Sequence, residues 1–189
     1  MLIPVLLTLA LLFAGLLAYA ASQPRRFRIA RSIEIAALPD AIFPWLNDLR
    51  AAQQWSPYER RDPAMKRAYG ATPAGTGAHY EFDGNRDVGA GSIDIVASEA
   101  PRRVELSLRM LKPMKADNVV EYTLERLHAG TVVTWAMSGD SPFIGRIVCL
   151  FFNMDRMVGR DFEAGLASLK LLVEEPGAPG AVPLQPVAS

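Results

Sequence analysis

The chain has 189 residues, half of them hydrophobic, and its 20 basic side chains balance 20 acidic ones. A formal charge of zero provides no basic surface for nucleic acid, so no nucleic-acid partner is expected. The single cysteine excludes a disulfide framework. Once the two unusual ends are set aside, about 150 residues remain, the size of one globular domain with a substantial core.

The chain begins with an apolar segment, Leu2 to Ala21, that carries no charge and is long enough to span a bilayer. Residues 1–22 are therefore expected to form a single-pass transmembrane anchor, since no basic residue precedes the apolar run. A cleaved signal peptide, and hence an exported or periplasmic protein, is the alternative, because Ala18-Tyr19-Ala20 has the small-x-small form. Four arginines follow directly: Arg25, Arg26, Arg28 and Arg31. They favour a membrane protein whose domain lies on the cytoplasmic side.

The domain is expected over residues 26–175 and starts with an alternating segment, Phe27 to Ile35, which predicts a strand. Leu38-Pro39-Asp40 has the features of a helix start, with Phe43 among the inward-facing residues that follow. Several shorter segments then alternate or have strand-like composition: 66–69, 79–82, 91–97, 104–110, 120–124 and 132–138. Turns separate them, so they predict an antiparallel meander.

The last ordered segment, Pro142 to Glu174, is expected to form one long amphipathic helix. At 100° per residue, five apolar side chains fall near a common line: Ile144, Phe151, Val158, Phe162 and Leu169. Asp155 falls inside this apolar stripe. Residues 176–189 contain four prolines and no charge, and are expected to be a disordered tail.

Strands followed by a long helix predict an α+β domain in which an antiparallel sheet packs against the helix. A curved sheet that wraps a helix leaves a ligand cavity between them. The expected ligand-binding residues come from different elements and point to one interior: Phe43, Trp55, Tyr80, Phe82, Met110, Tyr122, Trp135, Met137, Phe151, Asp155, Val158 and Phe162. An ordinary hydrophobic core explains the same residues, and the sequence leaves this alternative open.

Asp155 is the candidate catalytic residue. A carboxylate on the inner face of a helix must be paired, hydrogen-bonded or open to a wet cavity. In a cavity it would orient a polar ligand group or act as a general acid–base with a raised pKa. A structural partner, either an arginine or a hydrogen-bond donor such as Tyr122 or Trp135, is the other interpretation.

Other chemistry has no visible motif. The glycine pairs Gly75-Thr76-Gly77 and Gly89-Ala90-Gly91 do not stand between a strand and a helix, so they predict turns and bulges and not a phosphate-binding loop. No HExxH, CxxC or calcium-loop motif occurs, and no metal or other cofactor is expected.

Seven segments of the domain carry a recognisable pattern: Trp55-Ser56-Pro57, Asp62 to Lys66, Gly84-Asn85, Val88 to Gly91, Leu111-Lys112-Pro113, Val133 to Gly139 and Phe152 to Glu163. Together they resemble bacterial proteins of the SRPBCC superfamily that are labelled polyketide cyclase/dehydrase. The resemblance implies the START-like helix-grip fold, a bent antiparallel sheet around a long carboxy-terminal helix with a deep hydrophobic cavity. This superfamily includes lipid carriers, hormone receptors, cyclases and dehydratases, and it implies no catalytic residue for this chain.

The sequence thus predicts a membrane-tethered module that binds a small hydrophobic ligand, a lipid or a polyketide-like molecule. One alternative is a cyclase or dehydratase that uses Asp155 with Tyr80 or Tyr122 for proton transfer. The other is an interaction module whose interior is filled by its own side chains, for which a cavity below about 300 Å³ is expected.

Overall fold

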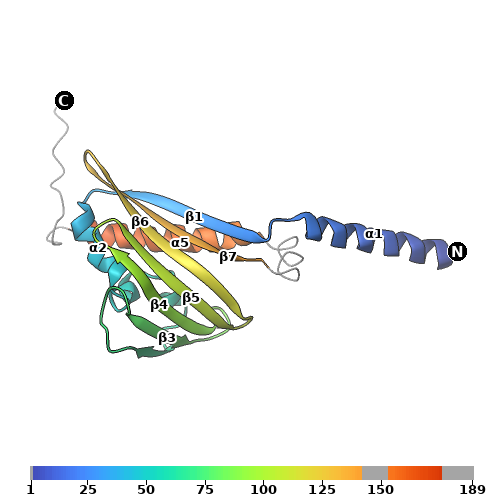
Figure 1. Cartoon of the computed structure of the whole chain (residues 1–189), viewed down its shortest axis with the longest axis horizontal. Helices are drawn as coiled ribbons and strands as arrows, with labels where there is room; N and C mark the ends of the chain where they lie inside the picture. The colour runs from blue at the N-terminus through green and yellow to red at the C-terminus, as the bar shows by residue number, and fades with distance from the viewer. Residues whose placement is uncertain (1, 142–152, 176–189) are drawn as a thin grey trace.

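The computed structural model describes residues 2–141 and 153–175, and within them one antiparallel sheet packs against a long helix (Figure 1). The elements are α1 (Leu2–Ser22), β1 (Arg26–Ile35), α2 (Pro39–Asn47), η1 (Ala51–Gln54), α3 (Pro57–Arg61), β2 (Lys66–Tyr69), β3 (His79–Asp83), β4 (Ala90–Glu99), β5 (Arg103–Lys112), β6 (Ala116–Leu127), β7 (Gly130–Asp140) and α5 (Met154–Glu174). The seven strands are ordered β1-β7-β6-β5-β4-β3-β2. The predicted α+β helix-grip architecture is confirmed.

Cross-strand register explains why the alternating residues of β6 and β7 meet on one face. Tyr122 is paired with Trp135, and Val120 with Met137, so these side chains stand side by side toward α5. All four are buried. The period of two that predicts each strand therefore also selects the residues that line the core.

Strand β1 forms one edge of the sheet, and α5 packs along this strand. Lys170 Nζ donates to the carbonyl oxygen of Glu34 at 2.8 Å, and the Ala36 amide donates to Glu174 Oε1 at 2.7 Å. Earlier in both elements, Arg31 contacts Asp155. The helix and the strand therefore run in the same direction, and the first turn of α5 lies toward the start of β1.

Bulges bend the sheet around the helix. The β4–β5 pairing shifts register between Ala90 and Gly91 and again between Ile95 and Ala97. Gly89 enters this strand with a φ of +79°, and a Cβ there would lie 2.3 Å from the carbonyl oxygen of Lys112. Only glycine fits this close approach, which explains why the chain has one at this corner.

Helix α5 begins at Met154, where the sequence predicted a helix from Pro142. The Asn153 side chain caps it by accepting a hydrogen bond from the Arg156 amide at 2.9 Å. Residues 142–152 lie outside the described part of the chain, as does the predicted tail, 176–189.

Helix α1 projects from the domain (Figure 1) and exposes apolar side chains such as Leu11, Leu12 and Phe13. The predicted transmembrane anchor is nevertheless not supported, because none of the helices in the described residues combines the length and the apolarity that a bilayer crossing requires.

Candidate functional site

Four aromatic side chains form a cluster between the sheet and α5, called here the inner aromatic cluster: Trp55, Tyr122, Trp135 and Phe162. The Trp135 and Phe162 rings stack with centroids 4.2 Å apart and an interplanar angle of 11°. Trp55 meets both Trp135 and Tyr122 edge to face, at 5.4 and 5.8 Å. All four residues are buried. The structure thus brings together four of the predicted site residues from η1–α3, β6, β7 and α5.

The two tryptophans of the cluster differ in how their indole N–H groups are satisfied. Trp55 Nε1 donates to the carbonyl oxygen of Trp45 at 3.0 Å. Trp135 Nε1 is buried and has no hydrogen-bond partner in the described structure. An unpaired buried donor costs roughly 1–3 kcal/mol. Trp135 is therefore the one feature of this cluster that ordinary core packing does not explain.

Tyr80 belongs to a separate polar group centred on Glu59. Its hydroxyl donates to Glu59 Oε1 at 2.7 Å, while Arg67 holds the other carboxylate oxygen at 2.7 Å. Tyr69 stacks on Tyr80 at 4.8 Å, and its own hydroxyl accepts a hydrogen bond from Gln53. Sequence reasoning missed Glu59, because the five-residue helix that carries it is too short for a periodic pattern to show which way it points.

Burial also fixes the protonation state of the interior tyrosines. Burial raises the pKa of Tyr122. The pKa of Tyr80 is raised mainly by burial and, to a smaller extent, by its hydrogen bond to Glu59. Both phenols are therefore neutral at physiological pH. They can donate hydrogen bonds, but neither is available as a phenolate base.

The remaining predicted site residues mostly line the core. Phe43, Phe82, Met137 and Val158 are buried in it, whereas Met110 is only partly buried against it. Phe151 lies outside the described residues. These positions are compatible with a ligand-lined interior and equally with a packed core, so their binding role stays a prediction.

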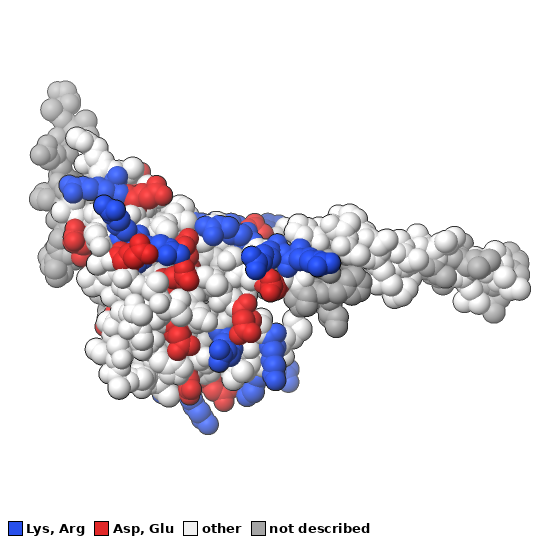
Figure 2. All heavy atoms as spheres, in the orientation of Figure 1, with Lys and Arg blue, Asp and Glu red and all other residues white. Residues whose placement is uncertain are grey.

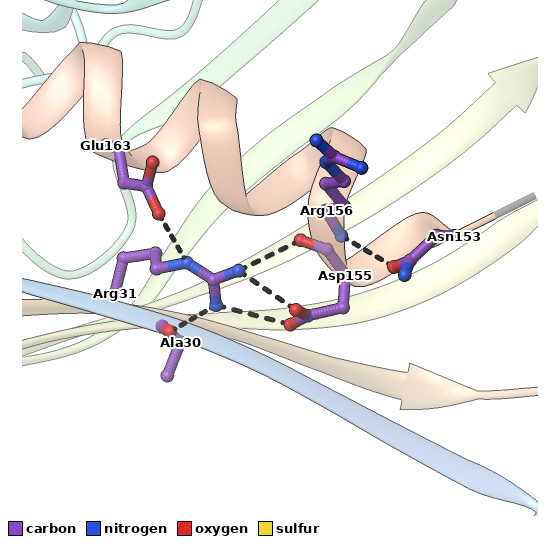
Figure 3. A network of polar contacts seen from close by, with 6 residues as sticks. All are labelled: Ala30, Arg31, Asn153, Asp155, Arg156 and Glu163. Atoms are coloured by element: carbon purple, nitrogen blue, oxygen red, sulfur yellow. Dashed lines mark hydrogen bonds and ion pairs between the residues drawn. The ribbon is translucent and has the colours of Figure 1, made fainter.

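Asp155 does not lie in the interior, and of the two interpretations that the sequence left open the structure shows the ion pair with an arginine. Its side chain is 63% exposed and forms a two-pronged ion pair with Arg31, at 3.0 and 3.2 Å (Figure 3). Arg31 Nε also donates to Glu163 Oε1 at 2.8 Å, and its Nη1 donates to the Ala30 carbonyl. The guanidinium sits against Gly159, where a Cβ would come within 2.1 Å of it.

This network removes the acid–base chemistry that the sequence suggested for Asp155. The hydrogen bond from Arg31 holds the pKa of the Asp155 carboxyl below its usual range. A general acid at neutral pH needs the opposite shift. The geometry makes Asp155 a structural ion-pair partner, and a role in catalysis has no support from its position.

A surface hollow of about 330 Å³ opens beside the first turns of α5 and is called here the arginine hollow. Its lining residues are Arg61, Asn153, Arg156, Met157, Arg160 and Asp161. None of the residues of the inner aromatic cluster lines it. In the part of the chain that the structure describes, no group of three or more His, Cys, Asp or Glu side chains is arranged to hold a metal ion.

The family described as "Polyketide cyclase / dehydrase and lipid transport" matches residues 26–174. A comparison with curated protein sequences gave no match. Protein MLL2253 from Mesorhizobium loti is similar in structure, with 14% identity, a TM-score of 0.58 and coverage of 78% of this chain and 97% of that chain.

Two further solved structures share the fold. Protein CV1439 from Chromobacterium violaceum has 17% identity and a TM-score of 0.57, covering 82% of this chain and 100% of that chain. The di-domain ARO/CYC protein StfQ from the steffimycin biosynthetic pathway has 13% identity and a TM-score of 0.59, covering 79% and 52%. The match over residues 26–174, with the helix-grip fold around it, shows that this chain belongs to the SRPBCC-type polyketide cyclase/dehydrase and lipid transport family.

Proposed function

We propose that the domain binds a small, flat hydrophobic ligand between the sheet and α5, and that Trp135 donates a hydrogen bond to a carbonyl or hydroxyl oxygen of this ligand. The observation that carries the proposal is the buried indole N–H without a partner. A ligand acceptor would remove the cost of leaving that donor unpaired. The aromatic faces of the cluster suit a planar or unsaturated molecule.

The family supports the same class of ligand. Its description joins polyketide cyclisation with lipid transport, and both involve hydrophobic molecules that carry oxygen atoms. One solved structure of the same fold comes from the steffimycin pathway and another, DynU16, from the dynemicin biosynthetic locus. A polyketide-like or lipid ligand is therefore the proposed class. Because the Trp135 ring already touches its neighbours, a bound ligand would displace one of these rings.

The test is native mass spectrometry of the full chain, released from a neutral detergent. We expect a co-purified small molecule on the wild-type protein. Trp135→Phe keeps a ring that can stack on Phe162 but removes the donor, so occupancy should fall about 3- to 10-fold, the effect of one hydrogen bond. In the ligand-free protein the lost ring atoms destabilise the core, but removal of the unpaired donor offsets part of that cost, so Trp135→Phe should destabilise the protein less than Trp55→Phe does.

Trp55→Phe is the matched control. It removes a donor that is already paired with the Trp45 carbonyl, so it should lower the free energy of unfolding by about 1 kcal/mol or more while the ligand is retained. Absence of any bound molecule, or equal occupancy in wild type and Trp135→Phe, would contradict the proposal. Those results would favour an interaction module whose interior is filled by its own side chains.

We further propose that α1 attaches this binding domain to a membrane, which would place it beside a source of hydrophobic ligand. Support comes from the uncharged sequence of Leu2 to Ala21 and from the exposed apolar side chains of the helix. Fractionation of cells that express the full chain tests this. The wild type should sediment with the membrane fraction, and replacing Leu12 and Phe13 by Glu should release it. Recovery of the wild type away from the membrane fraction would contradict attachment.

A further inference from the structure

We propose that the arginine hollow binds a phosphate group through Arg156 and Arg160, with Arg61 as the third guanidinium of its wall. This site is separate from the inner aromatic cluster and goes beyond the proposed function. The hollow is about 330 Å³, large enough for a phosphate with part of the molecule that carries it.

The charges around the hollow are not balanced. Arg61 is ion-paired with Asp161, through Nη1 and Oδ2 at 3.0 Å and through a second contact. Arg156 and Arg160 are exposed, and within the described residues no carboxylate lies within 4.0 Å of either guanidinium. Three guanidiniums against one carboxylate leave a formal charge of +2 in the hollow. A phosphate dianion, or a diester with one charge, would compensate it.

The neighbouring arginine shows that this imbalance is local. Arg31, on the other side of the same helix turns, is held by two carboxylates, Asp155 and Glu163. The acidic residues of the first helix turns therefore satisfy Arg31, and Asp161 satisfies Arg61. Among residues 2–141 and 153–175, no carboxylate pairs with Arg156 or Arg160. Guanidinium groups bind phosphate oxygens through two parallel N–H donors, which favours phosphate over a simple point anion.

The helix fixes the points on the backbone from which these two arginine side chains extend. The Asn153 side chain caps the helix through the Arg156 amide, and Asp161, which is buried, holds Arg61 from α3 against the same helix. Arg156 and Arg160 are four residues apart and so project from the same side of α5. A helix that is already formed loses less backbone entropy on binding than a mobile loop, so the remaining cost is that of ordering the two exposed side chains.

The location favours an amphiphilic ligand. The first turn of α5 lies toward the start of β1, where α1 leaves the domain, and Figure 2 shows basic side chains at that junction. Arg25 and Arg28, both exposed, follow α1 in the sequence. Met157, which is 59% exposed, adds an apolar surface to the wall of the hollow. Phosphate beside an apolar wall is the chemistry of a phospholipid headgroup, and a free phosphorylated molecule shares its anionic part.

The experiment measures binding of three probes to the full chain in neutral detergent by native mass spectrometry: inorganic phosphate, phosphatidylglycerol and phosphatidylcholine. The variant is Arg156→Gln with Arg160→Gln. Its matched control is Arg102→Gln with Arg126→Gln, which removes the same charge from exposed positions at the opposite end of the sheet. Thermal unfolding of each variant verifies that it is folded.

We expect phosphatidylglycerol to bind more tightly than zwitterionic phosphatidylcholine, and the hollow variant to lose at least 10-fold in affinity while the control loses less than 2-fold. Arginine-dependent binding of inorganic phosphate without phosphatidylglycerol would support the phosphate site and assign it to a small phosphorylated ligand. Equal binding by the hollow variant and wild type, or an equal loss in the control, would overturn the proposal. The hollow variant should still retain the ligand of the inner aromatic cluster. A loss of phosphate binding in this variant can then be told apart from a loss of ligand at Trp135.

Discussion

The interior and the first turn of α5 differ in solvent exposure although they share a face of the helix. Asp155 and Phe162 are seven residues apart, so they lie about 20° apart around the helix axis. Phe162 is 1% exposed, whereas the Asp155 side chain is 63% exposed. Helical phase therefore identifies the face that points to the sheet, but the position along the axis decides whether that face is buried.

The sheet residues that contact Phe162 and Asp155 also differ between interior and rim. Phe162 stacks on Trp135, and Asp155 pairs with Arg31. Trp135 and Arg31 are direct cross-strand partners on β7 and β1. Strand β7 therefore presents an aromatic ring to the helix, whereas the neighbouring edge strand β1 presents a guanidinium at the paired position. The centre of the contact excludes water, and its rim is held by an ion pair that is open to water.

The largest expected effect comes from emptying the interior. Phe162→Ala removes the ring that stacks on Trp135 and leaves a cavity that packed neighbours can fill only in part. We expect the free energy of unfolding to fall by about 3–5 kcal/mol, measured by urea unfolding of the full chain in neutral detergent.

Met157→Ala is the control on the same helix. Its side chain is 59% exposed, so a change of less than about 0.5 kcal/mol is expected. Similar losses in the two variants, or a loss below about 1 kcal/mol for Phe162→Ala, would mean that the cluster is not tightly packed.

The two buried glycines of α5 give a sharper comparison, because the same substitution meets a rigid neighbour in one place and a flexible one in the other. A Cβ on Gly165 would lie 2.7 Å from Trp135 Cζ3 and 3.0 Å from Pro57 Cδ. Neither ring can move without disturbing the core. We expect Gly165→Ala to cost about 1–3 kcal/mol even though alanine favours the helix by about 1 kcal/mol, measured by the same unfolding titration.

Gly159→Ala is its counterpart at the rim. The new Cβ would meet the Arg31 guanidinium, which is the far end of a flexible side chain that can swing toward solvent. The lost ion pairs offset the gain in helix propensity, and a net change within about 1 kcal/mol of zero is expected. A larger cost for Gly159→Ala than for Gly165→Ala would reverse the proposed contrast between rim and interior.

Most of the fold could be predicted from the sequence, but less of the candidate site could. Alternation in β5, β6 and β7 predicted which residues face the helix, because a strand has only two faces and each turn limits the register. The convergence of Trp55, Tyr122, Trp135 and Phe162 followed from this. Their packing distances and the unpaired Trp135 donor did not, because they depend on how strands far apart in sequence are spaced.

Charged partners at the rim of the domain were harder to predict, because the ion pairs of Arg31 and Arg61 join residues 100 or more positions apart. Arg31 meets Asp155 across 124 positions, and Arg61 meets Asp161 across 100. Nothing local in the sequence indicates which of the chain's 20 basic residues will reach a given carboxylate. The arginine hollow depends on both pairings, since they determine which arginines are left without a carboxylate.

The smallest expected effect tests the rim through pH. Arg31 lowers the pKa of Asp155 in the folded protein below the ordinary value of about 3.9 in the unfolded chain. A group whose pKa is lowered by folding contributes stability that is complete above its unfolded pKa and lost as the pH falls through its folded pKa. Wild type should therefore be more stable than Asp155→Asn between pH 5 and 7, in urea titrations at low salt, and the difference should shrink as the pH falls below about 4.

Arg31→Gln is the control that distinguishes the effect of this ion pair from a general effect of low pH on stability. Without the guanidinium, Asp155 has lost the partner that lowers its pKa, so adding Asp155→Asn should no longer change the pH dependence of stability. Because Asp155 is exposed, 1 M salt should also reduce the difference. A difference that instead grows as the pH falls through 4 would mean that the carboxyl is destabilised when ionised, as a buried acid would be, and would return Asp155 to the interior role that its helical phase suggested.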